Sequence, residues 1–104
     1  MEITSSELKS KIEAGESVMV AFTASWCGPC RMYKPTFQKI AESSDIPMYI
    51  MSVDDGGNGE LAVELGIRAV PTTKVFNNGG EVFSKPGMMS ENELKSVINN
   101  VING

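Results

Sequence analysis

Two cysteines separated by two residues carry the chemistry that this sequence offers. Cys27 and Cys30 are the only cysteines in the chain, and Gly28 and Pro29 lie between them. Two thiols at this spacing can close into a small disulfide ring and open again, which is the basis of thiol–disulfide exchange. The chain has no histidine, so Ser-His-Asp and Cys-His catalysis are excluded. The sulfur atoms must therefore react without an imidazole base.

The segments on either side of the cysteines predict that the two sulfur atoms are not equivalent. The apolar run 18–22 is typical of a buried strand, and the residues after Cys27 have the apolar spacing of an amphipathic helix. Cys27 therefore lies at a helix N-terminus, where free N–H groups and the helix dipole stabilise a thiolate, and Arg31 adds positive charge nearby. Cys30 falls on the inward face. We expect one exposed, activated sulfur and one buried sulfur within bonding range.

This inequality suits dithiol–disulfide exchange in two steps. Cys27 attacks a substrate disulfide and forms a mixed disulfide, and Cys30 then attacks Cys27 and releases the reduced substrate. A purely structural disulfide is one alternative, but so small a ring contributes only about 2 kcal/mol in the chain-entropy model. A metal site is another, but zinc takes four ligands and the sequence supplies two sulfurs and no imidazole.

The elements that position the cysteines include four expected helices, two of which begin with a capping box. These boxes are Thr4-x-x-Glu7 and Ser90-x-x-Glu93. Pro35 lies inside the helix that follows the cysteines and should kink it. The apolar stripes that define the four helices are Leu8 and Ile12; Tyr33, Phe37, Ile40 and Ala41; Leu61 and Leu65; and Leu94, Val97, Ile98, Val101 and Ile102.

The predicted strands alternate with these helices. An Asn/Gly turn at 77–80 between the last two strands is typical of a β-hairpin, and 54–59 is predicted as a flexible loop. This order predicts an α/β fold with a central mixed β-sheet flanked by helices on both faces. We find no linker or repeat, so we expect a single domain over 1–104. The predicted strands are 18–22, 46–53, 73–76 and 81–84.

The composition argues against several classes of function. The 104 residues carry nine Lys and Arg against 13 Asp and Glu, and the net charge of −4 argues against nucleic acid as a partner. No apolar run approaches the roughly 18 residues that span a bilayer, so we expect no membrane partner. The N-terminus lacks the basic and apolar regions of a secretory signal, which favours a cytoplasmic location.

Three motifs resemble those of the thioredoxin family, and the resemblance covers most of the chain. The segment Trp26-Cys27-Gly28-Pro29-Cys30 resembles the family signature, and a cysteine pair of this kind beside a βαβ pattern is a recognised thioredoxin-like motif. Segment 66–72 resembles the loop that holds a cis-proline, Pro71, facing the disulfide. The hairpin and Pro86-Gly87 resemble the C-terminal part of the family, and Pro35 matches its helix-kinking proline. The resemblance implies the thioredoxin fold.

The resemblance also implies an activity, a protein-disulfide reductase. In the family's pattern Cys27 is the nucleophile and Cys30 the resolving thiol, and the Gly28-Pro29 pair keeps the loop tight. Electrons would come from NADPH through a thioredoxin reductase, and the redox group would be the protein's own disulfide, with no other cofactor bound. The partners would be this reductase and disulfide-containing clients of a monomeric protein. An apolar rim would hold an extended client segment; its residues would be Trp26, Val70, Pro71 and Gly87.

The sequence departs from the family's pattern beneath the cysteines. Thioredoxins usually carry a buried Asp six residues before the first cysteine and a Lys on the next strand; here these positions are Ala21 and Ile50. Losing both members of a buried polar pair can be neutral, whereas losing one leaves a costly unpaired group. We hypothesise that Cys30 loses its proton through water or the departing sulfur and that resolution is slowed. Thr23 is a second departure, where a large aromatic residue is common.

Two other functions use the same fold. The chain could be a binding subunit that grips a partner through the surface around Trp26, with redox chemistry incidental; replacing both cysteines by serine separates this from an enzyme. It could also be a disulfide oxidase or isomerase, although Gly-Pro between the cysteines resembles the reducing members of the family. A reduction potential well above the cytosolic glutathione poise would favour that third function.

Overall fold

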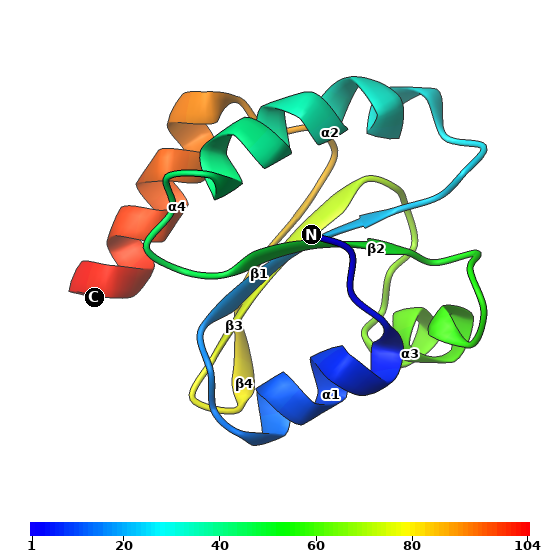
Figure 1. Ribbon diagram of the computed structural model, residues 1–104, viewed down its shortest axis with the longest axis horizontal. Helices are drawn as coiled ribbons and strands as arrows, with labels where there is room; N and C mark the ends of the chain where they lie inside the picture. Colours follow the sequence, from blue (N-terminus) through cyan, green and yellow to red (C-terminus); the bar gives the residue numbers. More distant parts are fainter.

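Four strands form one mixed sheet in the computed structural model, which describes residues 1–104. The spatial order is β2-β1-β3-β4, so β1 and β3 are central and β2 and β4 are edges (Figure 1). β1 runs parallel to β2 and antiparallel to β3, and β3 runs antiparallel to β4. The prediction of a central mixed sheet is therefore confirmed. The strands are β1 (Val18–Thr23), β2 (Met48–Ser52), β3 (Thr72–Asn77) and β4 (Gly80–Pro86).

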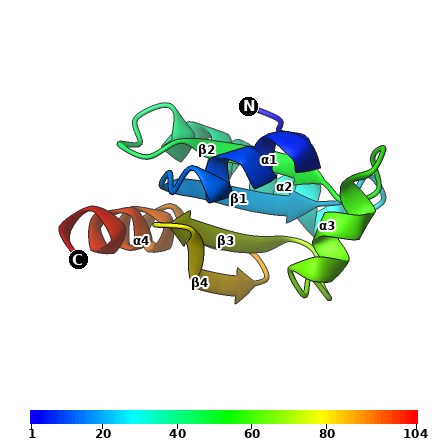
Figure 2. The ribbon, with the colours of Figure 1, turned by 90° about the horizontal axis from the view of Figure 1, so that it is seen from below.

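The helices lie in two layers, one on each side of the sheet. α2 and α4 cover one face and α1 and α3 cover the other, as Figures 1 and 2 show from two directions. Helices on both faces are what a strand-helix alternation requires, because each crossover between parallel strands must pass over the sheet. The helices are α1 (Ser5–Glu13), α2 (Gly28–Ala41), α3 (Asn58–Glu64) and α4 (Glu91–Asn103).

Each face of the sheet carries its own apolar core. Residues of β1 are all buried and alternate between the two sides, as the period of a strand demands. The side chains on the α2 face include Met19, Ala21, Ile50 and Val75, packed with Tyr33, Phe37, Leu94 and Ile98 of the helices. The α1 face contains Val18, Val20, Phe22, Met51 and Phe76, packed with Leu8 and Leu61.

The local sequence signals are confirmed where helices begin and the hairpin turns. Both capping boxes are complete, with reciprocal side-chain and backbone hydrogen bonds at Thr4 and Ser90. The hairpin turns at Asn78 and Gly79, which both have positive φ, the conformation of a type I′ turn. Pro35 lies inside α2, and the break after β4 falls at Pro86.

Three element boundaries differ from the predictions. α3 begins at Asn58, inside the predicted loop, because the buried Asn58 amide accepts from the Ser5 N–H and donates to the Ser52 carbonyl oxygen, both at 2.9 Å. The predicted strand 46–53 is shorter than expected. Ahead of α1, the chain forms one isolated bridge to β2, between Glu2 and Ile50. Ile102 of the last helical stripe is 46% exposed, in a final turn that projects beyond the sheet (Figure 1).

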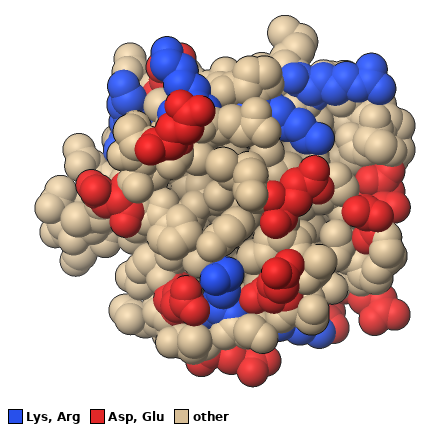
Figure 3. Space-filling model, in the orientation of Figure 1, with Lys and Arg blue, Asp and Glu red and all other residues tan.

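Charge of both signs is spread over the face of the molecule that Figure 3 shows. In Figure 3, acidic and basic side chains are interspersed, and several of the basic ones gather along the upper edge, over α2. Such a distribution agrees with the small net negative charge of the chain. None of the helices combines the length and the apolar character needed to cross a bilayer.

Candidate active site

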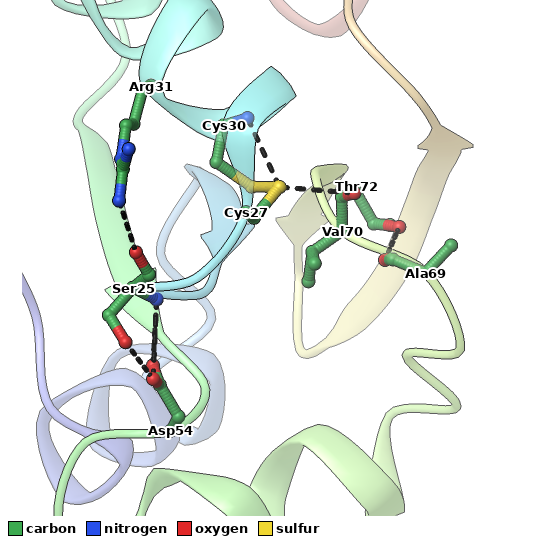
Figure 4. Close-up of a disulfide and its surroundings, with 8 residues drawn as sticks. All are labelled: Ser25, Cys27, Cys30, Arg31, Asp54, Ala69, Val70 and Thr72. Atoms are coloured by element: carbon green, nitrogen blue, oxygen red, sulfur yellow. Dashed lines mark hydrogen bonds between the residues drawn. A yellow bond between two sulfur atoms is a disulfide. The ribbon is translucent and has the colours of Figure 1, made fainter.

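The two cysteines form a disulfide at the N-terminus of α2. Cys27 is the N-cap residue, and its Sγ accepts a hydrogen bond from the N–H of Cys30 at 3.2 Å (Figure 4). Their Cα atoms are 5.3 Å apart, which is within the range that a disulfide bridges. Pro29 lies in the first turn, where its missing N–H is not needed. The sequence prediction of a sulfur at a helix start, where backbone N–H groups stabilise negative charge, is confirmed.

The expected contrast in exposure between the two cysteines is wrong for the disulfide form. Cys27 is only 4% exposed, and Cys30 is 0% exposed. Half-buried Val70 packs against the disulfide, and its carbonyl oxygen lies 3.5 Å from the Cys27 Sγ. The loop opposite the helix thus shields the first sulfur, and this long-range contact leaves no signal in the local sequence. The difference that remains is one of position: Cys27 borders the Val70 loop, and Cys30 lies on the inward face of α2.

Three segments distant in sequence converge around the disulfide. The Val70–Pro71 peptide bond is cis, as the resemblance implied, and Pro71 is buried next to β3. Gly87 donates its N–H to the Pro71 carbonyl oxygen at 2.8 Å and has φ +89°, a conformation that favours glycine. Trp26 is 72% exposed, so it is a surface residue beside the disulfide and not part of the core. Met88, next to Gly87, is 43% exposed.

A polar network holds the loop that leads into the disulfide, and sequence reasoning missed it. The Ser25 N–H donates to both oxygens of the Asp54 carboxylate at 3.2 and 3.3 Å, and the Ser25 hydroxyl donates to the same group. These hydrogen bonds lower the pKa of Asp54. Arg31 donates to the Ser25 carbonyl oxygen at 3.3 Å, so its guanidinium is tied to this loop (Figure 4). The only sequence signal was that Ser25 and Asp54 come shortly after two strands, and the carboxyl ends of parallel strands meet at the same edge of a sheet.

The sheet beneath the disulfide carries hydroxyl groups and no carboxylate. Ala21 and Ile50 are register partners on β1 and β2, and each is 1% exposed. The Tyr33 hydroxyl shares a 2.7 Å hydrogen bond with the Thr73 hydroxyl, and burial raises the pKa of Tyr33 to about 12. Thr23 is fully buried, and its Oγ1 has no hydrogen-bond partner. Ala21 and Ile50 therefore lie side by side, in an apolar setting.

The structure contains no cluster of side chains that could hold a metal ion. No three side chains of the His, Cys, Asp or Glu type converge anywhere in the structure. A zinc or iron–sulfur centre takes four such ligands. The arrangement at the α2 N-terminus is a disulfide between two buried sulfurs. The first belongs to the N-cap residue Cys27, and the second belongs to Cys30 on the inward face of α2.

Comparison with known proteins agrees with this geometry. The profile of the family described as Thioredoxin matches residues 1–100. The chain is similar to thioredoxin of Porphyra purpurea, with 32% identity over 97% of this chain and 95% of the other, and to thioredoxin of Mycoplasma genitalium, with 37% identity over 90% and 91%. Among solved structures, thioredoxin of Fasciola hepatica superposes with a TM-score of 0.84 at 30% identity, covering 96% of this chain and 98% of the other.

Proposed function

The chain belongs to the thioredoxin family of thiol–disulfide oxidoreductases, and we propose that it reduces client-protein disulfides with Cys27 as the nucleophile and Cys30 as the resolving thiol. The observation that carries this assignment is the position of the Cys27 Sγ at the N-cap of α2, within 3.2 Å of the Cys30 N–H. A thiolate at this point is stabilised by the helix dipole and by a backbone donor. Cys30 lies on the inward face and is reached only from Cys27.

The proposed cycle transfers two electrons to the client. The Cys27 thiolate attacks one sulfur of the client disulfide, and the client's S–S bond breaks to give a mixed disulfide and one client thiol. Cys30 then loses its proton and attacks the Cys27 Sγ, and the mixed disulfide breaks. The second client sulfur leaves as a thiolate and takes up a proton, while Cys27 and Cys30 become a disulfide.

We propose that the client lies against the rim formed by Trp26, Val70, Pro71 and Gly87. The exposure of Trp26 and the contact between the Val70 carbonyl and the Cys27 Sγ support this assignment. An extended client segment beside Val70 would pair with its backbone groups, as in strand addition to a sheet edge. Pro71 has no N–H, so it adds no donor close to the sulfur atoms.

The oxidised protein must be reduced again between turnovers. We propose a thioredoxin reductase that draws electrons from NADPH, acting on a monomeric protein in the cytoplasm. The family relationship and the protein's own disulfide as its redox group support this proposal. Its test is NADPH consumption in a mixture of the protein, candidate reductases and an insulin-type disulfide substrate.

Trapping of clients tests the roles of the two cysteines. Cys30→Ser should accumulate as a covalent mixed disulfide with client proteins, because Cys27 attacks and nothing resolves the product. Cys27→Ser should form no such complex and should have no reductase activity. Trapping by Cys27→Ser, with none by Cys30→Ser, would reverse the assignment of nucleophile and resolving thiol. The double serine variant is the matched control: retention of a partner by this variant would favour a redox-independent binding subunit.

The reduction potential separates a reductase from an oxidase or isomerase of the same fold. A reductase must have a potential near or below the glutathione poise of its compartment. We expect equilibration against glutathione redox buffers to place the Cys27–Cys30 couple on the reducing side. A value well above that poise would favour the oxidase or isomerase.

A further inference from the structure

We propose that Thr23 assists the resolving step: its hydroxyl donates a hydrogen bond to the Cys30 thiolate that forms when the disulfide opens. This inference rests on the proposed function, because Cys30 acts as a resolving thiol only after Cys27 has attacked a client. It assigns a role to a residue beneath the disulfide that the two-cysteine scheme leaves without one.

The first observation is an unpaired hydroxyl. Thr23 is 0% exposed, and its Oγ1 is the one buried side-chain nitrogen or oxygen without a hydrogen-bond partner. A buried hydroxyl that makes no hydrogen bond is unfavourable, so such groups in folded proteins call for an explanation. The structure contains the disulfide form, in which the Cys30 sulfur carries no charge. A partner that acquires charge only when the disulfide opens would account for the unpaired hydroxyl.

The second observation is the position of Thr23 in the sheet. Met19 and Ala21 of β1 face α2 and pack in the core with Tyr33, so Thr23, two residues further along, faces α2 as well. Phe22 is paired with Thr72 across β1 and β3, and continuing this register places Thr23 opposite Pro71. Thr23 therefore lies on the α2 face of the sheet, beside the segment Val70–Pro71 that borders the disulfide.

The third observation is that β1, β2 and β3 carry no ionisable side chain on this face. The residues of β1, β2 and β3 that face α2 are apolar or carry only hydroxyl or amide groups. The Thr73 hydroxyl is already bonded to Tyr33. Thr23 thus carries the hydroxyl on this face of the sheet whose hydrogen-bonding capacity is unused.

Three titratable groups of the surrounding elements have pKa values displaced away from neutral pH. Burial raises the pKa of Tyr33 on α2 to about 12. Hydrogen bonds from Lys85 of β4 and from the Ser90 N–H hold the pKa of Glu93, on α4, at about 2. Hydrogen bonds from Ser25 lower the pKa of Asp54, which follows β2. A pH dependence of the resolving step between about pH 6 and pH 9 therefore reports the cysteines.

In the proposed step, Thr23 moves no proton permanently and changes no electron count. The Cys30 thiol gives its proton to water, and the Thr23 O–H donates to the resulting thiolate. The thiolate then attacks the Cys27 Sγ, the Cys27–client bond breaks, and the client sulfur leaves as a thiolate that takes up a proton. Hydrogen bonds to charged groups are stronger than neutral ones, so the contact favours ionisation of Cys30 over its neutral thiol.

A chromophoric disulfide separates attack from resolution. The reduced protein, in excess over 5,5′-dithiobis(2-nitrobenzoate), releases one nitrothiobenzoate when Cys27 attacks and a second when Cys30 resolves the mixed disulfide. In stopped-flow measurements we expect Thr23→Val to leave the first release unchanged and to slow the second about tenfold near neutral pH. The pH midpoint of the second phase should rise by about one unit.

Matched variants separate a hydroxyl effect from a packing effect. Thr23→Ser keeps the donor and should keep the second rate, whereas Thr23→Ala should be as slow as Thr23→Val. Thr73→Val removes a neighbouring hydroxyl from the same face and should leave the second rate unchanged. If Thr73→Val slows resolution as much, or if Thr23→Ser is as slow as Thr23→Val, the role of the Thr23 hydroxyl is refuted.

A second measurement does not depend on the exchange reaction. In a Cys27→Ser background, the ultraviolet absorbance of the Cys30 thiolate as a function of pH gives its ionisation midpoint without a reagent having to reach the buried sulfur, and Thr23→Val should raise that midpoint by about one unit. An unchanged midpoint would overturn the inference. Absence of the first nitrothiobenzoate release in the unmodified protein would instead contradict the proposed function. The two failures are therefore distinguishable.

Discussion

Each face of the sheet carries a buried core, but the two faces differ in charge. On the α1 and α3 side, the side chain of Lys74 is 7% exposed and forms an ion pair with Glu81 at 2.6 Å and a hydrogen bond with Ser84 at 3.1 Å. On the α2 and α4 side, the same sheet carries Ala21 beside Ile50 under the disulfide, and the buried polar groups there are hydroxyls.

The difference follows from where each face can find a counter-charge. Lys74 lies next to the edge strand β4, whose Glu81 side chain is 40% exposed and can reach both the buried ammonium and solvent. The centre of the other face is covered by α2 and α4, so a lone charge there would be desolvated without compensation. The buried charge of Lys74 therefore lies where the partly exposed Glu81 can reach it. The disulfide lies over a neutral part of the other face, which offers no base.

Introducing an acid under the disulfide should remove the difference in charge between the two faces and have the largest effect on the reaction. Ala21→Asp places a carboxylate beside Ile50, and we expect resolution in single-turnover reduction of a disulfide client to become faster and newly pH-dependent, because burial brings the pKa of a carboxyl towards the range of a general base. Ala21→Asn is the matched control, since it is similar in size and has no base. Unchanged rates between about pH 6 and pH 9 would refute the idea that the missing acid limits resolution.

The same substitution should have a large cost in stability. A buried carboxylate with no partner costs several kcal/mol, so Ala21→Asp should unfold at clearly lower urea concentration than the unsubstituted protein. The addition of Ile50→Lys, the register partner, should recover part of this loss. Recovery by Ile50→Met to the same extent would indicate a packing effect and not a charge pair.

Removing the counter-charge on the other face tests how much the Lys74–Glu81 pair stabilises the fold. Glu81→Ala leaves the buried Lys74 ammonium with Ser84 alone, and we expect a loss of about 1–2 kcal/mol in the free energy of unfolding, less than for a fully buried pair because Glu81 is partly exposed. Lys74→Met combined with Glu81→Ala should restore most of it. Neither variant should alter disulfide reduction, and a changed reduction rate would show that the two faces are coupled.

A smaller effect is expected from the hydroxyl pair of the neutral face. Tyr33→Phe leaves the Thr73 hydroxyl without its 2.7 Å partner, and we expect a loss of about 1 kcal/mol in urea unfolding. Thr73→Val should cost a similar amount, and the double variant should cost less than the sum. Strict additivity would mean that the two hydroxyls do not stabilise each other.

The exposed rim should give the smallest effect. Lys85 and the Ser90 N–H lower the pKa of Glu93 from 4.5 to about 2, so this carboxylate stabilises the fold fully above pH 4.5 and the stabilisation is lost as the pH falls towards 2. Glu93→Gln should therefore melt slightly below the unsubstituted protein at neutral pH, and the difference should vanish near pH 2. A constant difference in melting temperature across this range would argue that the charge is not involved.

Local sequence predicted much of the fold because its signals act over a few residues. The capping boxes at Thr4 and Ser90, the inward stripe of α2 and the Asn78-Gly79 turn each depend on neighbours within one or two turns of chain. The start of α3 was misplaced because it depends on Asn58, whose amide bonds to Ser5, 53 residues away. No feature of the sequence near Asn58 indicates that contact.

By itself, the sequence determined which atoms react and that one of them lies at the start of a helix. Cysteine spacing, an apolar strand and an amphipathic helix are enough for that, since each is a property of contiguous residues. Only the tertiary structure decided how far Cys27 is shielded, which residues lie beneath Cys30, and where Lys74 finds its partner. Those features arise where segments from different parts of the chain pack together, and burial and pairing are properties of that packing and not of any one segment.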